Sequence, residues 1–148
     1  MKLYRNFLSL SPDERKLFIQ VSFTLIAFRA ALRLIPFKKL LRLIDRFKPA
    51  PVSTDLDALY KERYVRAVSR AGNHVLRNNV CLPQALAVYT MLKRHGESAQ
   101  LQIGVRKDDR GDLKAHAWVE NRGQVLIGGV GIDLERYVKL HGLNGVVV

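Results

Sequence analysis

The chain of 148 residues is 48% hydrophobic and 26% charged, a balance that fits one ordered globular domain and excludes an intrinsically disordered protein. Its single cysteine excludes an intramolecular disulfide, so we expect a reducing, cytoplasmic location. The formal net charge of +12 predicts attraction to acidic partners, but no zinc finger, helix-turn-helix or RNA-binding signature accompanies it, and no nucleic-acid partner is expected.

The N-terminal part of the chain has the pattern of two helices. Ser11, Pro12 and Glu14 form a capping box with proline at the first helical position. Residues 17–28 are rich in large apolar side chains, and Arg29 and Arg33 then interrupt this run too soon for a membrane span. The sequence therefore predicts a long apolar helix that packs on its own domain.

The second predicted helix covers residues 37–47 and follows Pro36, which ends or kinks the first. It mixes basic side chains with apolar ones, and three interpretations fit such a helix. An apolar stripe that packs on the same domain is favoured. Peripheral contact with an anionic membrane and docking to a partner protein are the alternatives.

Two prolines at 49 and 51 predict a linker over residues 48–53. We therefore divide the chain into a helical N-terminal extension, residues 1–50, that packs on the core, and a single compact core, residues 51–148. Thr54 has the character of an N-cap for a helix that runs to about residue 76. Six apolar residues recur in it at helical spacing and should face the core: Leu56, Leu59, Tyr60, Val68, Ala71 and Val75.

Cys81 stands where a polar turn at residues 77–79 gives way to another helical run. Pro83 is well placed for a first helical turn, and His95 followed by Gly96 predicts the end of this helix. The positive end of a helix stabilises a thiolate, which is the nucleophilic form of cysteine. An inert, buried thiol that packs in the core is the alternative interpretation.

Beyond Gly96 the hydrophobic period changes from helical to two, which predicts strands. The expected order is a strand around residues 101–105, a turn at 107–112, a strand at 113–120, a hairpin turn at 121–123 and a strand at 124–127. The predicted fold class is therefore α+β, with a helical N-terminal half followed by a small antiparallel sheet. In such a fold the helix that carries Cys81 can pack across the sheet.

His116 lies within the second of these strands. Alternation puts it on one face with Trp118 and Glu120. An imidazole near a helix-terminal thiol can take the proton from sulfur and later give it to a leaving amine. Asn79 is a candidate donor to an oxyanion and Trp118 a candidate wall of the substrate cleft. A core histidine is the alternative, and spacing alone does not decide between the two.

These blocks together resemble a known family. The sequence Cys-Leu-Pro-Gln-Ala-Leu-Ala at 81–87, Ile-Gly-Val-Arg at 103–106 and Ala-His-Ala-Trp-Val-Glu at 115–120 is similar to that of the transglutaminase-like cysteine protease superfamily. More narrowly, the chain resembles the leader-peptidase (B-type) protein of lasso-peptide biosynthesis. The resemblance extends over nearly the whole chain, including the helical N-terminus.

The resemblance implies a papain-like fold and a Cys-His-Asp triad that removes the leader from a ribosomally made precursor peptide. The implied partners are that precursor, a separate leader-recognition protein and an asparagine-synthetase-like cyclase that closes the macrolactam ring. No bound cofactor is expected, and the resemblance leaves a dependence on ATP open. No metal site is predicted, because the histidines lack ligand spacing and one cysteine cannot build a zinc site.

One position departs from the family pattern. The third triad member is usually an acid about a dozen residues beyond the histidine, and Gly128 or a neighbour occupies that place here. Asp133 is the nearest later acid, although its position also fits the N-cap of a short helix. Glu120 is the other acid near His116, and a Cys-His dyad oriented by backbone or water is a third solution.

Three other functions remain as alternatives. The same fold can serve as a non-catalytic adaptor that binds a peptide or partner protein. It can transfer the acyl group to an amine rather than to water, as transglutaminases do. A basic module for membrane or nucleic acid is the last alternative, and it predicts binding that weakens steeply with salt.

Overall fold

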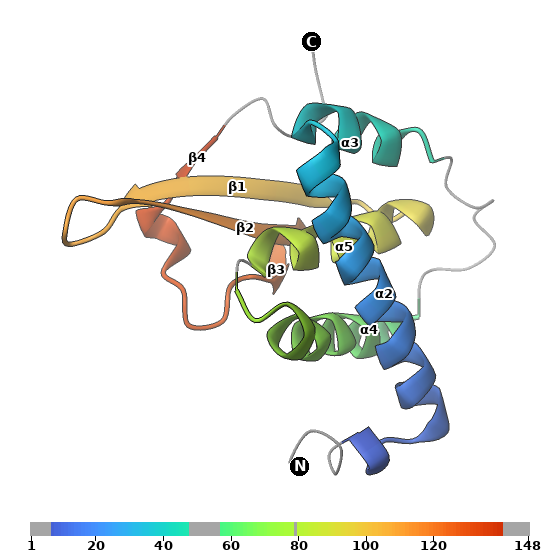
Figure 1. The fold of residues 1–148 in the computed structure, drawn as a ribbon. Helices are drawn as coiled ribbons and strands as arrows, with labels where there is room; N and C mark the ends of the chain where they lie inside the picture. The colour runs from blue at the N-terminus through green and yellow to red at the C-terminus, as the bar shows by residue number, and fades with distance from the viewer. Residues whose placement is uncertain (1–6, 48–56, 79, 141–148) are drawn as a thin grey trace.

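A computed structural model describes residues 7–47, 57–78 and 80–140 (Figure 1). Over these residues four α-helices come first and carry the labels α2 (Pro12–Leu34), α3 (Phe37–Asp45), α4 (Ala58–Ala71) and α5 (Cys81–Arg94). An antiparallel sheet follows, with β1 (Gln100–Lys107), β2 (Leu113–Asn121), β3 (Gln124–Ile127) and β4 (Val138–Lys139). The predicted α+β class, with helices before the sheet, is confirmed. The predicted linker at 48–53 and the N-cap at Thr54 lie outside the described residues.

The start of α2 is set by local chemistry. The Ser11 hydroxyl accepts from the Glu14 backbone N–H at 3.3 Å, and the Glu14 carboxylate accepts from the Ser11 N–H at 2.9 Å. Pro12 begins the helix, where its missing N–H has no intrahelical partner to lose. Two side chains on the inner face, Val21 and Leu25, are fully buried against the other helices. The capping box predicted from sequence is confirmed.

The helix α4 starts later than predicted. Asp57 is its N-cap and accepts from the Leu59 N–H at 3.1 Å. Leu59 and Tyr60 therefore sit in the exposed first turn, and the prediction that they face the core is wrong. The π-helical turn η1 (Gly72–Leu76) follows α4, shifts the helical phase and leaves Val75 exposed as well. Val68 and Ala71 are fully buried, as predicted.

The central helix is α5, which begins at Cys81 and is capped by Gly96 in the left-handed conformation, at a φ of +71°. Five of its side chains have no solvent exposure: Ala85, Leu86, Ala87, Val88 and Leu92. The Gln84 amide donates to the carbonyls of Val68 and Ser69 at the end of α4. These contacts fix α5 between α2, α4 and the sheet.

The sheet has the strand order β3-β2-β1-β4. In the long hairpin of β1 and β2, Gly104 pairs with His116 and Gln102 with Trp118. Arg122 and Gly123 join β2 to β3 with positive φ values of 50° and 79°, which is the conformation of a tight hairpin turn. The two-residue strand β4 was not predicted. It returns along the outer edge of β1.

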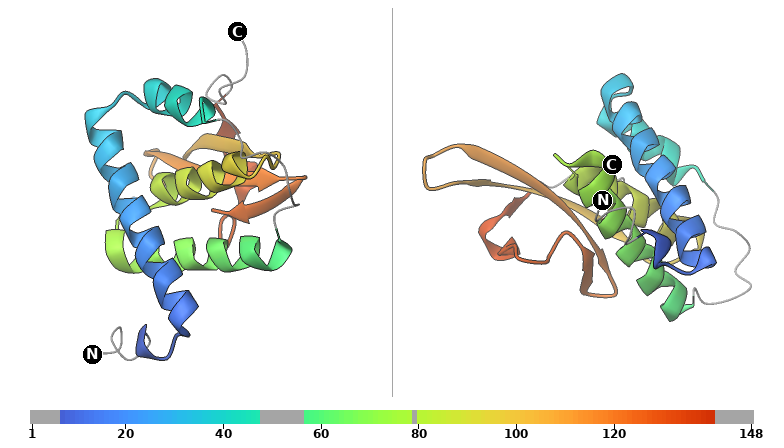
Figure 2. Two further views of the ribbon diagram at one scale, coloured as in Figure 1. Left: turned by 90° about the vertical axis from the view of Figure 1, so that its right-hand side faces the viewer. Right: turned by 60° about the horizontal axis from the view of Figure 1, so that its bottom comes forward.

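The two faces of the sheet have different neighbours. Ala117 and Val119 join the hydrophobic core beneath the helices. Trp118, which is also fully buried, points the other way and is covered by the segment between β3 and β4. Figure 2 shows this segment and the helices on opposite sides of the sheet. The alternation predicted for β2 is confirmed.

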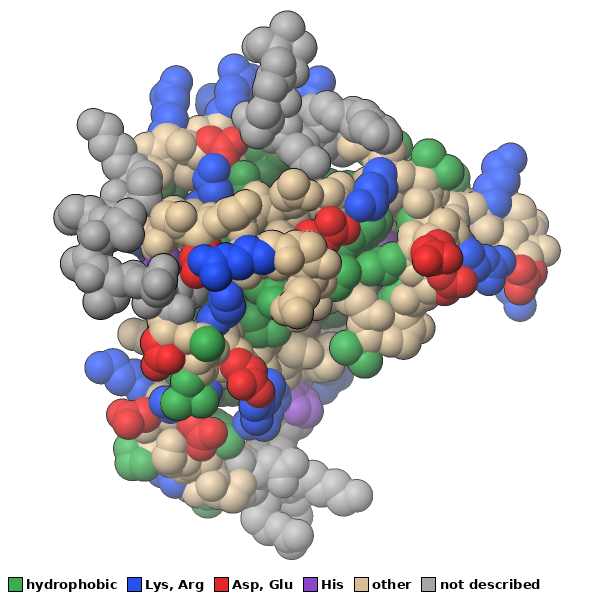
Figure 3. Space-filling view, turned by 180° about the vertical axis from the view of Figure 1, so that it is seen from behind, with side chains coloured by type: hydrophobic (Ala, Val, Ile, Leu, Met, Phe, Trp, Pro, Cys, Tyr) green, Lys and Arg blue, Asp and Glu red, His purple; other side chains and the backbone are tan. Residues whose placement is uncertain are grey.

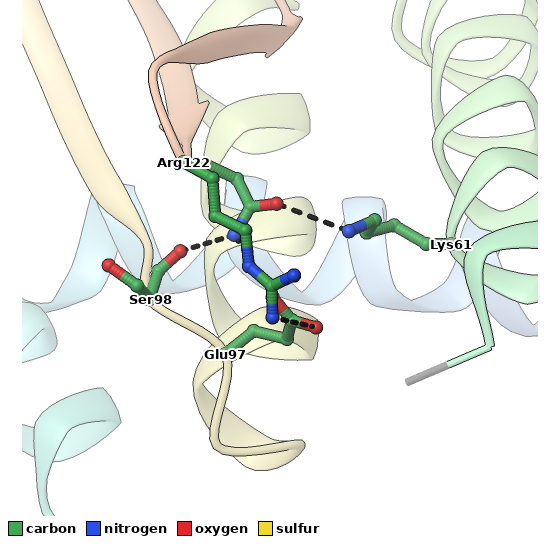
Figure 4. Close-up of polar contacts among 5 residues, drawn as sticks. Lys61, Glu97, Ser98 and Arg122 are labelled. Carbon is green, nitrogen blue, oxygen red and sulfur yellow. Dashed lines mark hydrogen bonds and ion pairs between the residues drawn. The ribbon is translucent and has the colours of Figure 1, made fainter. Parts of the chain in front are cut away.

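A buried polar cluster anchors the β2–β3 turn (Figure 4). The Asn121 amide donates to Glu97 Oε2 at 3.2 Å and to the Ser98 carbonyl, while its oxygen accepts from Lys61 Nζ at 3.2 Å. Arg122 forms an ion pair with Glu97 at 3.4 Å. The hairpin is thereby tied to α4 and to the segment that leads into β1, which fixes the position of β3.

Candidate active site

Cys81 is the first residue of α5, as predicted. Its side chain is half-buried and packs against the edge of the hydrophobic core. The N-cap residue Val80 provides no side-chain cap, and Pro83 has no N–H. The N–H groups of Cys81 and Leu82 therefore have no intrahelical acceptor. A thiol at such a terminus lies beside the positive end of the helix dipole and beside donors suited to an oxyanion.

His116 is in β2, and its ring is held on three sides. Nε2 lies 2.6 Å from the Gly128 carbonyl oxygen. The ring stacks on Trp118 with centroids 6.2 Å apart, and the Tyr137 ring lies against it at 5.7 Å. These contacts fix the plane of the imidazole.

The hydrogen bond to Gly128 also fixes the tautomer. A carbonyl oxygen only accepts, so Nε2 carries the proton and donates it. In the neutral ring Nδ1 then holds the lone pair and is the basic nitrogen. A triad acid has the same effect on an imidazole, because it accepts from one nitrogen and leaves the other as the base.

Gly128 therefore performs with its backbone what an acid would perform with its side chain, and it does so twelve residues beyond His116. A residue with a Cβ atom does not fit at position 128. The backbone has a φ of +87°, and a Cβ atom would lie 2.6 Å from the Ala117 carbonyl oxygen and 2.8 Å from the Trp118 Cβ. The partner that orients the His116 ring is therefore a backbone carbonyl, one of the orienting groups that the sequence left open.

Helix α5, which begins with Cys81, and the strand β3, which Gly128 follows, meet at one end of the fold. Helix α5 packs on β2 and contacts β3. In Figures 1 and 2, β3 runs back toward the end of α5 that begins with Cys81. Alternation puts the His116 side chain on the face of the sheet away from α5. Since β3 pairs only with residues 119–121 of β2, no described strand covers this edge of β2 beside His116.

The other predicted site residues have different surroundings. Asp133 is the N-cap residue of the 3₁₀ turn η2 (Leu134–Arg136), where its side chain makes no capping hydrogen bond. Trp118 donates its indole N–H to Glu120 Oε1 at 2.8 Å, which occupies its only polar group. Asn79 lies outside the described residues. Glu120, the other acid considered from the sequence, is therefore hydrogen-bonded to Trp118 on the outer face of the sheet.

Tyr137 and Lys139 contribute to this face without having been predicted. Tyr137 stands immediately before β4, and the Arg106 guanidinium lies 5.3 Å from its ring centre. Lys139 Nζ lies 5.7 Å from the Trp118 ring centre and 3.0 Å from Glu120 Oε1. A two-residue strand has too short a pattern to be found from sequence. Among the described residues, no group of three or more His, Cys, Asp or Glu side chains is placed to hold a metal.

Acid should weaken the attachment of β4 to the sheet. Partial burial alone would raise the pKa of Glu120, but hydrogen bonds from Trp118 and Lys139 outweigh it and lower the pKa below the usual 4.5. The ionised form is therefore favoured in the folded state, and its contribution is lost as the pH falls below 4.5 through the folded pKa. We expect urea unfolding to show Glu120→Gln less stable than the wild type at pH 7, with the difference shrinking toward pH 3. A constant difference across this range would contradict the assignment.

Comparison with known proteins identifies one family. The model of the transglutaminase-like superfamily matches residues 24–141, which include both Cys81 and His116. No curated protein and no solved structure matched the chain. The family model covers most of the chain, and its range contains α3, α4, α5 and the whole sheet. This chain is therefore a member of the transglutaminase-like superfamily.

Proposed function

We propose that this protein is a cysteine peptidase that cuts the leader from a ribosomally made lasso-peptide precursor, beside a leader-recognition protein and a macrolactam cyclase. Membership of the superfamily indicates cysteine-protease or acyl-transfer chemistry. The lasso assignment is supported by the motifs at 81–87 and 115–120. The observation that carries the enzymatic proposal is the His116 ring, oriented by Gly128 at the end of the fold where α5 begins with Cys81.

In the proposed reaction, Cys81 Sγ and His116 Nδ1 meet around the open edge of β2. Nδ1 takes the thiol proton as sulfur attacks the scissile carbonyl. The N–H groups of Cys81 and Leu82 donate to the oxyanion that forms. His116 then returns its proton to the leaving amine, and a thioester joins the leader to Cys81.

Water completes the cycle. His116 Nδ1 removes a proton from water as the oxygen attacks the thioester, and the same proton returns to sulfur as the Cys81 thiol leaves. The leader then ends in a new carboxylate, and the remaining peptide has a free amine for ring closure by the cyclase. Throughout, Nε2 donates to the Gly128 carbonyl, which stabilises the protonated ring.

The test is leader release from a precursor peptide in ¹⁸O-labelled water, with the leader-recognition protein and cyclase present, followed by mass spectrometry. A peptidase releases a leader whose new carboxylate carries ¹⁸O. A leader that carries an added amine in place of ¹⁸O would retain the cysteine chemistry but overturn the hydrolase assignment. An intact precursor bound to the protein would identify an adaptor instead.

A further inference from the structure

The outer face of α2 is apolar over most of its length. Four large side chains follow one another along this face and are exposed: Ile19 at 46%, Phe23 at 70%, Ile26 at 49% and Leu34 at 83%. Ala27 and Ala30 fall between them and are exposed too. We call these six residues the α2 stripe. A continuous apolar surface of this kind on a folded domain marks a contact with another phase or molecule.

The opposite face of α2 is attached to the domain. Val21 and Leu25 are buried, and the helix packs on α4, η1 and α5 on the side away from the sheet (Figure 2). Arg29 Nη1 donates to the carbonyls of Leu76 at 3.3 Å and Asn78 at 2.8 Å. The helix is therefore a fixed part of the fold, with only its outer side available.

By length and composition alone, α2 could cross a membrane. Its run without charges covers only residues 17–28, however, between Lys16 and Arg29. At 1.5 Å per residue this run is about 18 Å long, against about 30 Å for the apolar core of a bilayer. The attached inner face also opposes insertion across a membrane. The geometry favours a helix that lies along a surface.

The charges on and beside α2 indicate which kind of surface the helix would bind. Residues 12–47 contain eight Lys and Arg against three Asp and Glu. Lys16 and Arg33 lie beside the stripe, and Lys38 and Lys39 follow its end in the first turn of α3; all four are exposed. A second copy of this chain, also at +12, would be repelled. On the face turned away from α2, by contrast, basic side chains are interspersed with acidic ones (Figure 3).

We propose that the α2 stripe binds in the plane of an anionic phospholipid bilayer, with Lys16, Arg33, Lys38 and Lys39 at the level of the head groups. Apolar area and basic charge act together in such helices, and each basic side chain near an anionic surface adds to the binding. The stripe faces away from the sheet, so the edge of β2 beside His116 is not covered by the bound membrane. This inference stands independently of the proposed peptidase function.

The test is sedimentation of the full chain with vesicles. Wild-type protein should bind vesicles of equal parts phosphatidylglycerol and phosphatidylcholine, and should dissociate from them in high salt. Phe23→Glu should weaken this binding by about tenfold or more, because a phenyl group no longer enters the bilayer. Lys38→Gln with Lys39→Gln should weaken binding by about tenfold through the lost charges.

The matched control is Leu113→Glu, which introduces the same charge change at another exposed apolar position, 67% exposed in the β1–β2 hairpin. It should bind almost as the wild type does. Equal losses in Phe23→Glu and Leu113→Glu would overturn the proposal, as would wild-type binding to pure phosphatidylcholine as strong as to anionic vesicles. Failure to bind either vesicle would also overturn it, as would a dimer that Phe23→Glu dissociates. All variants are exposed substitutions, and thermal unfolding checks that they fold.

Discussion

Replacing Cys81 by alanine should leave no detectable leader release, and replacing His116 by alanine should slow release by about 10²–10⁴-fold. The first substitution removes the atom that attacks the peptide bond. The second removes the base and acid, while the helix terminus and the oxyanion donors stay. The measurement is the rate of leader release by mass spectrometry under single-turnover conditions. Because the two residues act in one step, the double variant should likewise release no detectable leader.

The control is His95→Ala at the opposite end of α5. The His95 ring bonds to the Met91 carbonyl at 2.8 Å and belongs to the helix terminus. The His95→Ala variant should retain nearly full activity. If His116→Ala is as active as His95→Ala, the proposed role of His116 is wrong.

Proximity of the two residues can be measured without substrate. A short bis-alkylating reagent such as 1,3-dibromoacetone should join Cys81 to His116 in the wild type, because it bridges only neighbouring nucleophiles. The cross-linked peptide pair should be absent from both alanine variants. Alkylation of Cys81 in the wild type with no bridge to His116 would place the thiol out of reach and contradict the mechanism.

Replacing Gly128 by alanine should disable the site although no functional side chain is lost. The new Cβ would meet the Ala117 carbonyl oxygen at 2.6 Å, so the backbone has to move and the carbonyl that orients His116 moves with it. We expect a loss of about 1–3 kcal/mol in stability and a loss of activity of about tenfold or more, since a small misplacement of a catalytic group is costly. Gly128→Asp should not restore activity, because its Cβ meets the same atoms.

Gly111→Ala is the control for backbone strain. Gly111 has a φ of +85°, almost that of Gly128, but no atom lies within 4 Å of the Cβ it would gain. The two variants therefore share the cost of a left-handed alanine and differ in the clash. Nitrogen NMR of the His116 ring gives the direct readout. The wild type should show a protonated Nε2 and a free Nδ1, and Gly128→Ala should show a mixture. An unchanged ring spectrum and full activity in Gly128→Ala would refute the positioning role.

Local signals explain which elements could be predicted from the sequence. The capping box at Ser11, Pro83 in the first turn of α5 and Gly96 after its last turn each act within a few residues, and all three are present in the structure. The hairpin at Arg122 and Gly123 is of the same kind. The alternation of β2 correctly separated Trp118 from Ala117 and Val119.

Features that depend on distant contacts were missed. Leu59 and Tyr60 keep the helical period but precede the part of α4 that other elements cover, so the period alone put them wrongly in the core. The π-helical turn after Ala71 has no sequence signature. The solvent exposure of Val75 that results from it could therefore not be predicted. β4 exists because Val138 pairs with Val105, which lies 33 residues away.

The candidate site divides in the same way. Cys81 and His116 could be proposed from the sequence because a thiol and an imidazole are side chains with recognisable neighbours. The sequence left a backbone partner for His116 open but could not indicate Gly128, because a main-chain oxygen has no residue-type signature. The signal that remained was indirect: a glycine at the place where the family pattern has an acid.

The main-chain partner of His116 also has a consequence for how such sites are studied. A carbonyl oxygen neither titrates nor disappears when its residue is changed, so alanine scanning of acidic residues would find no third participant. For this chain, the glycine at position 128 is therefore no argument against catalysis, since its carbonyl already holds the His116 ring.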